Sequence, residues 1–319
     1  MKKKIYNEIV DQIVNIIEDS GQLPWQATWF NRQINGALKT EYRGYNQIFL
    51  SYDAFKKKYD FPIWFTFKQV NQLGGRVKKG AKSSSVFLAR VWTPQILKSQ
   101  CKHCKHFEND TGHCRKGNDV WKNKHWDEKV KCEEYDGKKQ FFVMRSYRVF
   151  NIEETTLNPE EFLPLLKEEQ KQEAEVFIEA IQKDGVSINF GGQRACYNHE
   201  TDTITMPKKE IFFSLGEYYL TFFHEIIHAT GHEKRLNRKN KDKSYDAHQN
   251  YSYEELVAEL GASFLCRKTG MNFDVKNTAS YLQGWVKYLQ NHKKAIVCAS
   301  YDAEKAVAYI EKIGGRDHD

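Results

Sequence analysis

Apolar residues recur at helical spacing near the start of the chain. Ile5, Ile9, Ile13 and Ile16 follow one another at intervals of three or four, with acidic residues between them, and this period predicts an amphipathic helix. Because charged residues interrupt the apolar positions, the segment does not resemble the apolar core of a signal peptide. No run of the sequence reaches the roughly 18 apolar residues of a membrane span. We therefore expect a cytoplasmic protein with reduced cysteines.

The pattern of apolar and polar positions along the rest of the chain predicts an α+β protein of two domains. The first domain, residues 1–153, combines the opening helix with a small sheet that includes strands over Ser85–Trp92 and 141–150. The second domain covers residues 154–319. Its predicted elements are a helix from Pro159 to Lys183, strands over Val186–Phe190 and Ala195–Met206, and helices over 214–232, Tyr253–Leu265, 274–292 and 301–312.

Charge divides the chain in the same way. Residues 1–153 contain 28 Lys and Arg against 16 Asp and Glu, whereas residues 154–319 contain 21 against 26. The net charge of +7 therefore combines a basic half with a mildly acidic half. This asymmetry supports a domain boundary near residues 153–170, where acidic residues cluster.

The most specific motif is H-E-x-x-H, formed by His224, Glu225 and His228 within an apolar stretch. Two histidines four residues apart lie on one face of a helix, so both rings can bind a single Zn²⁺. Glu225 lies between them, where it can take a proton from a water that the zinc activates for attack on a carbonyl. The motif predicts a zinc-dependent hydrolase, for which Tyr251 and Tyr253 are nearby candidates as transition-state donors.

A third zinc ligand is predicted on the helix Tyr253–Leu265. Glu255 and Glu259 lie four residues apart and hence on one helix face. We assign Glu255 as the third ligand and Glu259 as the carboxylate that accepts the free N–H of a zinc histidine. Glu254 is the less favoured alternative ligand. The metzincin pattern is excluded because its third histidine would stand at position 234, which is Lys234.

Basic and aromatic residues are interleaved in the first domain. A groove for single-stranded nucleic acid needs this combination, because cations meet the phosphates while flat rings stack on unpaired bases. No helix-turn-helix or basic-zipper pattern is visible, which favours single-stranded over duplex DNA. Each tryptophan can instead belong to the hydrophobic core. The residues predicted to contact DNA are Trp25, Trp29, Tyr42, Arg43, Tyr45, Asn46, Trp64, Lys68, Arg76, Lys78, Lys79 and Lys82.

Four cysteines lie in a hydrophilic insertion, at about residues 98–140, between the two predicted strands of the first domain. Cys101 and Cys104 open with the C-x2-C spacing of a zinc knuckle, and Cys114 and Cys132 complete a possible set of four thiolates. A structural zinc would stabilise a segment with little core of its own, and an iron–sulfur cluster is the alternative. The histidines that can replace one cysteine are His103, His106 and His113.

Short segments spread over nearly the whole chain carry a family resemblance. They are Pro24–Trp25, Tyr42–Asn46, Trp64–Gly80, Tyr147–Asn151, Asp202–Pro207, Tyr218–His228, Thr230–His232, Arg235–Leu236 and Tyr253–Leu265. In this order they resemble the ArdC-type antirestriction family, which is carried by plasmids, phages and other mobile elements. The four-cysteine insertion departs from the general pattern of that family.

The resemblance implies an N-terminal domain that binds single-stranded DNA and a C-terminal zincin metallopeptidase domain. It also implies a zinc site on His224, His228 and the Glu255 region, with Glu225 as the catalytic residue. The expected function is antirestriction or DNA protection, with an unknown protein substrate such as a restriction or DNA-repair protein.

Three alternatives stay open. The first is a non-catalytic single-stranded-DNA-binding protein in which zinc is structural. The second is a general metalloprotease with a basic accessory domain. The third, a nucleic-acid-modifying metalloenzyme, is less favoured, because H-E-x-x-H differs from the H-x-E…P-C-x-x-C arrangement of zinc deaminases.

Overall fold

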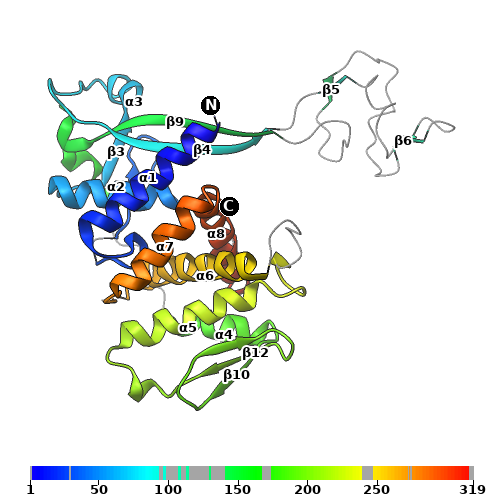
Figure 1. Ribbon diagram of the computed structural model, residues 1–319. Helices are drawn as coiled ribbons and strands as arrows, with labels where there is room; N and C mark the ends of the chain where they lie inside the picture. The colour runs from blue at the N-terminus through cyan, green and yellow to red at the C-terminus, as the bar shows by residue number, and fades with distance from the viewer. Residues whose placement is uncertain are drawn as a thin grey trace. The chain divides into compact units, whose positions relative to one another are not determined.

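The computed structural model describes residues 2–28, 30–92, 96–97, 107–108, 113–114, 129–130, 141–166, 174–238, 247–271, 273 and 275–315. The chain forms two compact units. One unit combines Tyr6–Val86 with Arg148–Asp319, and the other combines Met1–Ile5 with Phe87–Tyr147. The chain contains both helices and strands, and its last four elements are all α-helices (Figure 1). The α+β class predicted from the sequence is confirmed.

Helix α1 (Lys2–Ser20) confirms the predicted amphipathic helix. Ile9 and Ile13 are fully buried, whereas Asp11 on the opposite face is exposed. The helix ends at Gly21, whose N–H bonds the carbonyl of Ile17 at 2.9 Å and whose positive φ of 64° turns the chain out of the helix. Glycine suits this position because it adopts the left-handed conformation without steric cost.

Five strands form the sheet of the N-terminal domain, in the order β2-β1-β3-β9-β4. Strand β3 (Ile63–Thr66) lies at the centre, parallel to β1 (Ile34–Asn35) and antiparallel to β9 (Phe141–Asn151). The edge strands are β2 (Thr40–Glu41) and β4 (Ser84–Trp92). Strands β4 and β9 confirm the two strands predicted on either side of the insertion.

Alternate residues of β3 pack on opposite faces of this sheet, as the pleat requires. Trp64 packs against helix α2 (Tyr45–Lys57), and Phe65 packs against helix α3 (Phe67–Gln72). Both rings are fully buried. The sheet is therefore covered on both faces, and the core of the domain lies around β3.

The insertion between β4 and β9 is described only at four short strands. They pair as β5 (Ile96–Leu97) with β8 (Lys129–Val130), and as β6 (Phe107–Glu108) with β7 (His113–Cys114). The side chains of the four cysteines, Cys101, Cys104, Cys114 and Cys132, lie outside the described residues. The four-cysteine metal site therefore stays a prediction.

The helix predicted over Pro159–Lys183 differs from the observed structure at its start. Residues 159–166 form the 3₁₀ helix η5 (Pro159–Leu166), and the α-helix α4 (Ala174–Lys183) follows. Pro164 lies inside η5, and its ring cannot donate the backbone hydrogen bond that an α-helix interior needs. The end of α4 at Lys183 agrees with the prediction.

A three-stranded sheet opens the C-terminal domain, in the order β10-β12-β11. Strand β12 (Thr203–Met206) lies parallel to β10 (Ser187–Phe190) and antiparallel to β11 (Cys196–Asn198). The single strand predicted over Ala195–Met206 is therefore a hairpin. The Asn198 side chain accepts hydrogen bonds from the next backbone N–H groups, as in an Asx turn.

Four helices complete the domain: α5 (Leu215–Thr230), α6 (Ala247–Thr269), α7 (Ala279–Asn291) and α8 (Ala295–Ile313). Figure 1 shows α5 and α6 running side by side. They approach closely at Gly261, where a Cβ atom would lie 2.8 Å from side-chain atoms of Ile227. The absence of a side chain at this position lets the two helices bring their polar residues together.

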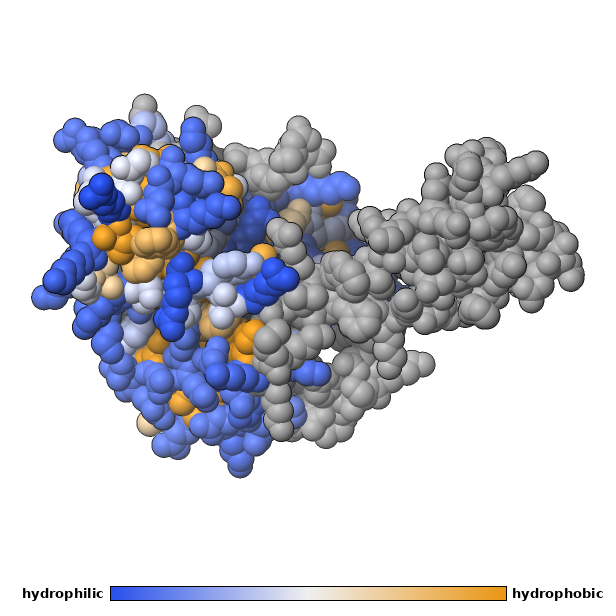
Figure 2. Space-filling view, turned by 90° about the horizontal axis from the view of Figure 1, so that it is seen from above, coloured by the Kyte–Doolittle hydropathy of each residue, from blue (hydrophilic) through white to orange (hydrophobic). Residues whose placement is uncertain are grey.

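No helix in the described part of the chain is long and apolar enough to cross a bilayer. The face drawn in Figure 2 is mostly hydrophilic, with apolar residues gathered in separate patches. Three large apolar side chains of α5, those of Phe222, Phe223 and Ile226, lie in the core.

Candidate metal centre

Helix α5 presents the two histidines of the H-E-x-x-H motif. The helix starts after Ser214, whose hydroxyl accepts a hydrogen bond from the N–H of Glu217 at 3.1 Å. Residues 222, 223, 226 and 227 bury the apolar face. His224 and His228 are one turn apart on another face, where both side chains keep partial exposure. The predicted helix and the juxtaposition of its histidines agree with the structure.

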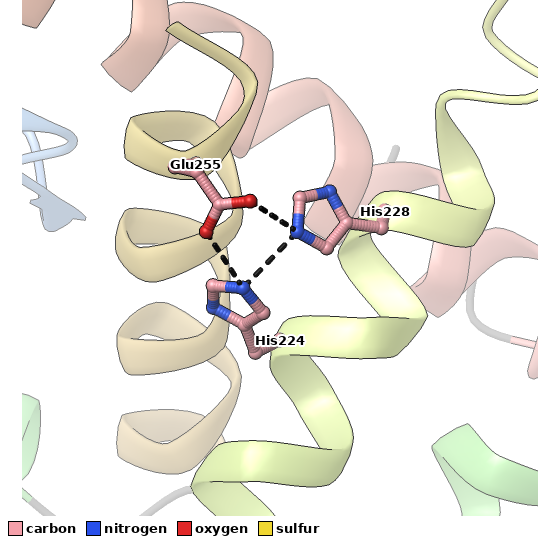
Figure 3. A group of neighbouring side chains, drawn as sticks. All are labelled: His224, His228 and Glu255. Atoms are coloured by element: carbon pink, nitrogen blue, oxygen red, sulfur yellow. Dashed lines mark hydrogen bonds and ion pairs between the residues drawn. The ribbon is translucent and has the colours of Figure 1, made fainter. Parts of the chain in front are cut away.

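Helix α6 brings Glu255 to the same point (Figure 3). Oε2 of Glu255 lies 3.3 Å from Nε2 of His224, and Oε1 lies 3.5 Å from Nε2 of His228. The two histidine Nε2 atoms are 3.0 Å apart. One ligand atom from each of the three residues thus faces a common centre.

This geometry fits a divalent metal. A tetrahedral zinc with bonds of about 2.0–2.1 Å holds its ligand atoms roughly 3.3 Å apart. In the structure the two Nε2 atoms are 3.0 Å apart, and each lies 3.3 or 3.5 Å from a different oxygen of Glu255. Two imidazoles and one carboxylate form a set of three protein ligands that leaves a coordination position open. Of the two adjacent glutamates, Glu255 is the one whose oxygens face the Nε2 atoms of both histidines, and its role as third ligand stays a prediction.

Charge and burial act against each other at this centre. Burial alone would lower the pKa of His228, but the neighbouring carboxylates of Glu254 and Glu255 outweigh it and raise the pKa to about 9. Burial likewise opposes ionisation of Glu255, and its contacts with His224 and His228 hold its pKa well below the usual range. Without a metal, the carboxylate and the rings thus stabilise each other.

Glu254 takes a role that we predicted for another residue. Its Oε1 atom lies 3.6 Å from Nδ1 of His228, the ring nitrogen that points away from the metal position. The same oxygen accepts a hydrogen bond from Nη2 of Arg238 at 2.7 Å. The carboxylate beside Nδ1 of His228 is therefore that of Glu254, whereas Glu259, for which we predicted such a role, bonds other groups.

Glu259 instead joins α6 to the N-terminal domain. Its Oε2 atom accepts a hydrogen bond from Nε1 of Trp25 at 2.9 Å, and its Oε1 atom accepts one from the hydroxyl of Tyr281. Burial raises the pKa of Glu259, although both donors oppose that rise. Trp25 lies in the short 3₁₀ helix η1 (Pro24–Gln26), so an N-terminal segment contacts the ligand helix one turn from Glu255.

Glu225 and the two candidate tyrosines, Tyr251 and Tyr253, differ in exposure and in their contacts. Glu225 lies on α5 between the histidines and is 7% exposed. Tyr251 is exposed and lies beside Glu255, whose charge raises the pKa of the phenol. The hydroxyl of Tyr253 donates to Asp302 at 2.8 Å. Of the two tyrosines, only Tyr251 is left beside the metal ligands.

Three of the aromatic residues predicted to contact DNA are buried instead. Trp25 and Trp64 have no exposed surface, and Tyr45 is 7% exposed. Nε1 of Trp64 donates to the Gln33 side chain at 2.6 Å. A fully buried ring cannot stack on a base, so the prediction is wrong for these three residues. Tyr42 is half-buried against the same core.

The predicted cationic residues are exposed. They are Arg43, Lys68, Arg76, Lys78, Lys79 and Lys82. Asn46 is half-buried, and Trp29 lies outside the described residues.

An exposed aromatic ring next to Lys68 was missed. Phe67 is 57% exposed because β3 ends at a capping box, in which Thr66 and Gln69 bond each other's backbone N–H groups. The spacing Thr66-x-x-Gln69 was the readable signal that the strand stops and a helix begins. Arg148, also missed, is exposed on β9 next to Val149, the partner of Thr66.

Two family models match the chain. Residues 172–302 match the zincin-like metallopeptidase family. Residues 3–150 match the N-terminal domain of anti-restriction factor ArdC. The fold and the site thus define a two-domain protein with a zincin-like metallopeptidase domain and residues suited to a divalent metal.

Solved structures give a narrower assignment. The antirestriction protein ArdC of plasmid R388 is 27% identical in its metal-free structure, with a TM-score of 0.70 over 98% of this chain and 99% of that one. Its Mn(II)-bound structure is 26% identical, with a TM-score of 0.69 over the same shares. The chain is therefore an ArdC-type protein.

Curated relatives extend the comparison. Two Escherichia coli proteins named DNA primase TraC are 30% and 28% identical over 97% of this chain. The chain spans only 20% and 27% of their lengths. A Sinorhizobium fredii protein, the uncharacterized protein y4eC, is 26% identical over 96% of this chain and 91% of its own length.

Proposed function

We propose that this ArdC-type protein is an antirestriction protein that binds single-stranded DNA and carries a zinc-dependent peptidase site. The observation that carries the proposal is the convergence of His224, His228 and Glu255, whose ligand atoms all lie within 4.8 Å of one another. This site lies in a zincin-like domain that follows an ArdC N-terminal domain. The protein named in the matching structures is an antirestriction protein.

The proposed chemistry is hydrolysis of a peptide bond. A bound zinc polarises the carbonyl and lowers the pKa of water. His224, His228 and Glu255 would hold the ion, and Glu225 would accept the proton of the attacking water and deliver it to the leaving amine. Tyr251, exposed beside Glu255, would donate a hydrogen bond to the developing oxyanion.

The proposed DNA surface combines exposed cations with an exposed ring. Lys68 and Phe67 are adjacent at the start of α3, and Arg148 lies on the neighbouring strand β9. The loop over residues 76–82 adds four exposed cations. Such a surface can neutralise phosphates and stack one base, with a salt dependence of about −0.7 in log–log slope for each phosphate neutralised.

Joining the two activities in one chain would concentrate the peptidase near DNA-bound proteins. A tether raises the effective concentration of one site near the ligand of the other. The proposed protein substrate is therefore a protein that meets incoming DNA in the cytoplasm, such as a restriction or DNA-repair protein. A general metalloprotease would cleave the same protein equally well with and without DNA.

The test is delivery of unmodified DNA into a restricting host that expresses wild type, Glu225→Gln or the double variant Lys79→Gln/Lys82→Gln. Equal protein levels are checked by immunoblot, and transfer efficiency is the readout. We expect wild type to protect the DNA, Glu225→Gln to lose protection, and the double variant to lose part of it. Equal protection by wild type and Glu225→Gln would show that DNA binding alone suffices and that the metal centre is not needed as a catalyst.

A further inference from the structure

Arg238 is a buried cation at the end of the histidine helix. Its side chain is 3% exposed. Nη1 donates to the hydroxyl of Thr230 at 2.6 Å, and Nη2 donates to the carbonyl of Ile227. Because the last carbonyls of a helix have no partner within the helix, Arg238 binds the C-terminal turn of α5, the turn that contains His228.

The same guanidinium binds Glu254. Nη2 lies 2.7 Å from Oε1, and Nε lies 3.3 Å from Oε2, so both carboxylate oxygens are held in a two-point contact. Oε1 is also the oxygen that lies 3.6 Å from Nδ1 of His228. A chain of contacts therefore leads from the end of α5 to the metal position, through Arg238, Glu254 and His228.

Gly231 leaves the space that this chain of contacts occupies. A Cβ atom at position 231 would lie 2.9 Å from Nη2 of Arg238 and 3.1 Å from Oε1 of Glu254. The φ of Gly231 is −75°, which any residue can adopt, so backbone conformation does not require glycine here. Glycine is required here because the guanidinium of Arg238 and the carboxylate of Glu254 approach the position so closely.

We propose that Arg238 is a positioning residue of the metal centre, which holds Glu254 against Nδ1 of His228 and so directs the Nε2 lone pair of that ring toward the metal. The proposal rests on the metal site proposed above. A carboxylate that accepts the Nδ1 proton fixes the tautomer and the orientation of a ligating imidazole. Without Arg238, the carboxylate of Glu254 would lose its two-point partner and could turn away from the ring.

Arg235 is a matched control. Its side chain is 2% exposed, and its Nε atom donates to the carbonyl of Ala229 at 2.8 Å, also in the last turn of α5. Its guanidinium is paired with Asp202 rather than with Glu254. Arg235 and Arg238 thus share burial, charge and contact with the helix end, but only Arg238 reaches a carboxylate at a metal histidine.

The experiment measures the affinity of the full-length metal-free protein for Zn²⁺ by competition with a chromophoric chelator. Every variant carries serine at Cys101, Cys104, Cys114 and Cys132, so that the predicted four-cysteine site does not bind the ion. Arg238→Gln should lower the affinity about 10- to 100-fold, the usual effect of losing an outer partner of a ligand. Arg235→Gln should change it less than about threefold, although thermal unfolding will show a loss of stability in both. Arg238→Lys keeps the charge without the two-point contact, and should recover part of the affinity.

The visible spectrum of the Co²⁺-loaded protein should change with Arg238→Gln and not with Arg235→Gln.

Equal losses of affinity in Arg238→Gln and Arg235→Gln would overturn the proposal, because they would show a general effect of destabilising α5. If either glutamine variant does not fold, Glu254→Gln replaces Arg238→Gln and Asp202→Asn replaces Arg235→Gln, with the same contrast expected. Unchanged affinity in Glu254→Gln would also overturn it. If wild type binds no Zn²⁺, Co²⁺ or Mn²⁺, the proposed metal site itself fails. If wild type binds the metal but Arg238→Gln and Arg235→Gln have the same affinity for it, only the proposed role of Arg238 is wrong.

Discussion

At the scale of single residues, two adjacent glutamates reach one histidine from different sides. Glu255 faces Nε2 of His228, and Glu254 faces Nδ1. Consecutive residues of a helix point about 100° apart, so one carboxylate can act as ligand while its neighbour supports the ring from behind. A change at either position affects the same imidazole, but only a change at Glu255 removes a ligand atom.

The pair Asp202–Arg235 is a second buried ionic contact near the end of α5. The side chains are 9% and 2% exposed, and Asp202 also accepts a hydrogen bond from the hydroxyl of Tyr197 at 2.7 Å. Burial opposes ionisation of Asp202, but Tyr197 and Arg235 more than offset it, so the pKa of Asp202 is lowered. This group ties the hairpin β11-β12 to the segment after α5.

We predict that Asp202→Asn lowers the free energy of unfolding at pH 7 by about 3 kcal/mol, because it leaves the buried Arg235 unpaired. Asparagine accepts the positive φ of 52° at this position, so backbone strain adds little. The folded pKa lies below the unfolded value of about 3.9, so the stabilisation is fully present above that value and is lost as pH falls through the folded pKa.

The measurement is urea unfolding of both proteins from pH 7 down to the lowest pH at which both fold. The difference between them should narrow at the acid end. Asp60→Asn, a change at an exposed aspartate, serves as control and should have little effect at any pH. A difference between wild type and Asp202→Asn that stays constant down to the acid limit would contradict the ionic origin of the stabilisation.

The proximity of the two histidines could be predicted from sequence because it follows a short-range rule. The spacing of His224 and His228 alone places both rings on one helix face. Glu259 was misassigned, since its true partner, Trp25, is 234 residues away in the sequence. No residue next to Trp25 or Glu259 in the sequence indicates that these two side chains meet. The contact between Arg238 and Glu254 is also not indicated by the sequence around either residue.

At the scale of elements, the metal centre depends on how closely α5 and α6 approach. Gly261 faces Ile227, which immediately precedes His228, and Glu255 lies on the same helix as the glycine. A side chain at position 261 would separate the two helices near the ligands. The distance between helices is thus a direct determinant of ligand geometry.

We predict that Gly261→Ala lowers the free energy of unfolding by about 1–3 kcal/mol through overpacking, and that it weakens Zn²⁺ binding. Gly284→Ala is the matched control, because Gly284 lies within α7 and a Cβ there would meet no atom within 4 Å. That change should raise stability by roughly 0.5–1 kcal/mol. Thermal unfolding measures the stability of both variants, and chelator competition measures their affinity for Zn²⁺. A stability gain in Gly261→Ala would show that Ile227 can move aside.

Element types were predictable from periodicity, but breaks within an apolar run were not. The amphipathic helix α1 and the helices α5 and α6 follow from the spacing of their apolar residues. The run Ala195–Met206 contains a hairpin because Asn198 forms a turn with side-chain hydrogen bonds. The η5 segment, which contains Pro164, is a 3₁₀ helix over its whole length. In each case one residue with a special backbone or side-chain preference outweighs the average pattern.

At the scale of the whole molecule, the two domains share polar contacts within one compact unit. Trp25 donates to Glu259, and the N–H of Gly44 donates to Glu304 at 2.9 Å. Arg267 of α6 pairs with Glu41 of β2 at 3.0 Å. Several residues that the sequence assigns to DNA binding, Trp25 and Tyr45 among them, are therefore buried where the N-terminal elements meet α6 and α8 or in the adjacent core.

Substitutions of Trp25 and Phe67 test whether buried aromatic residues support the fold while an exposed aromatic residue binds DNA. Trp25→Phe keeps an aromatic ring in the core but removes the N–H that bonds a buried carboxylate, so it should lower the free energy of unfolding by about 1–3 kcal/mol and leave DNA affinity unchanged. Phe67→Ala removes an exposed ring, so stability should stay nearly constant while the affinity for single-stranded DNA falls by about 1–3 kcal/mol, the contribution of one stacked base.

Fluorescence anisotropy with a labelled single-stranded oligonucleotide, at several salt concentrations, measures the affinities, and urea unfolding measures the stabilities. Loss of the ring at position 67 should lower affinity at every salt concentration without changing the slope, because the number of neutralised phosphates stays the same. Lys79→Gln/Lys82→Gln should reduce the slope instead. If Trp25→Phe weakened DNA binding while Phe67→Ala did not, the DNA surface would have to lie elsewhere, and the contact between Trp25 and Glu259 would have to open when DNA binds.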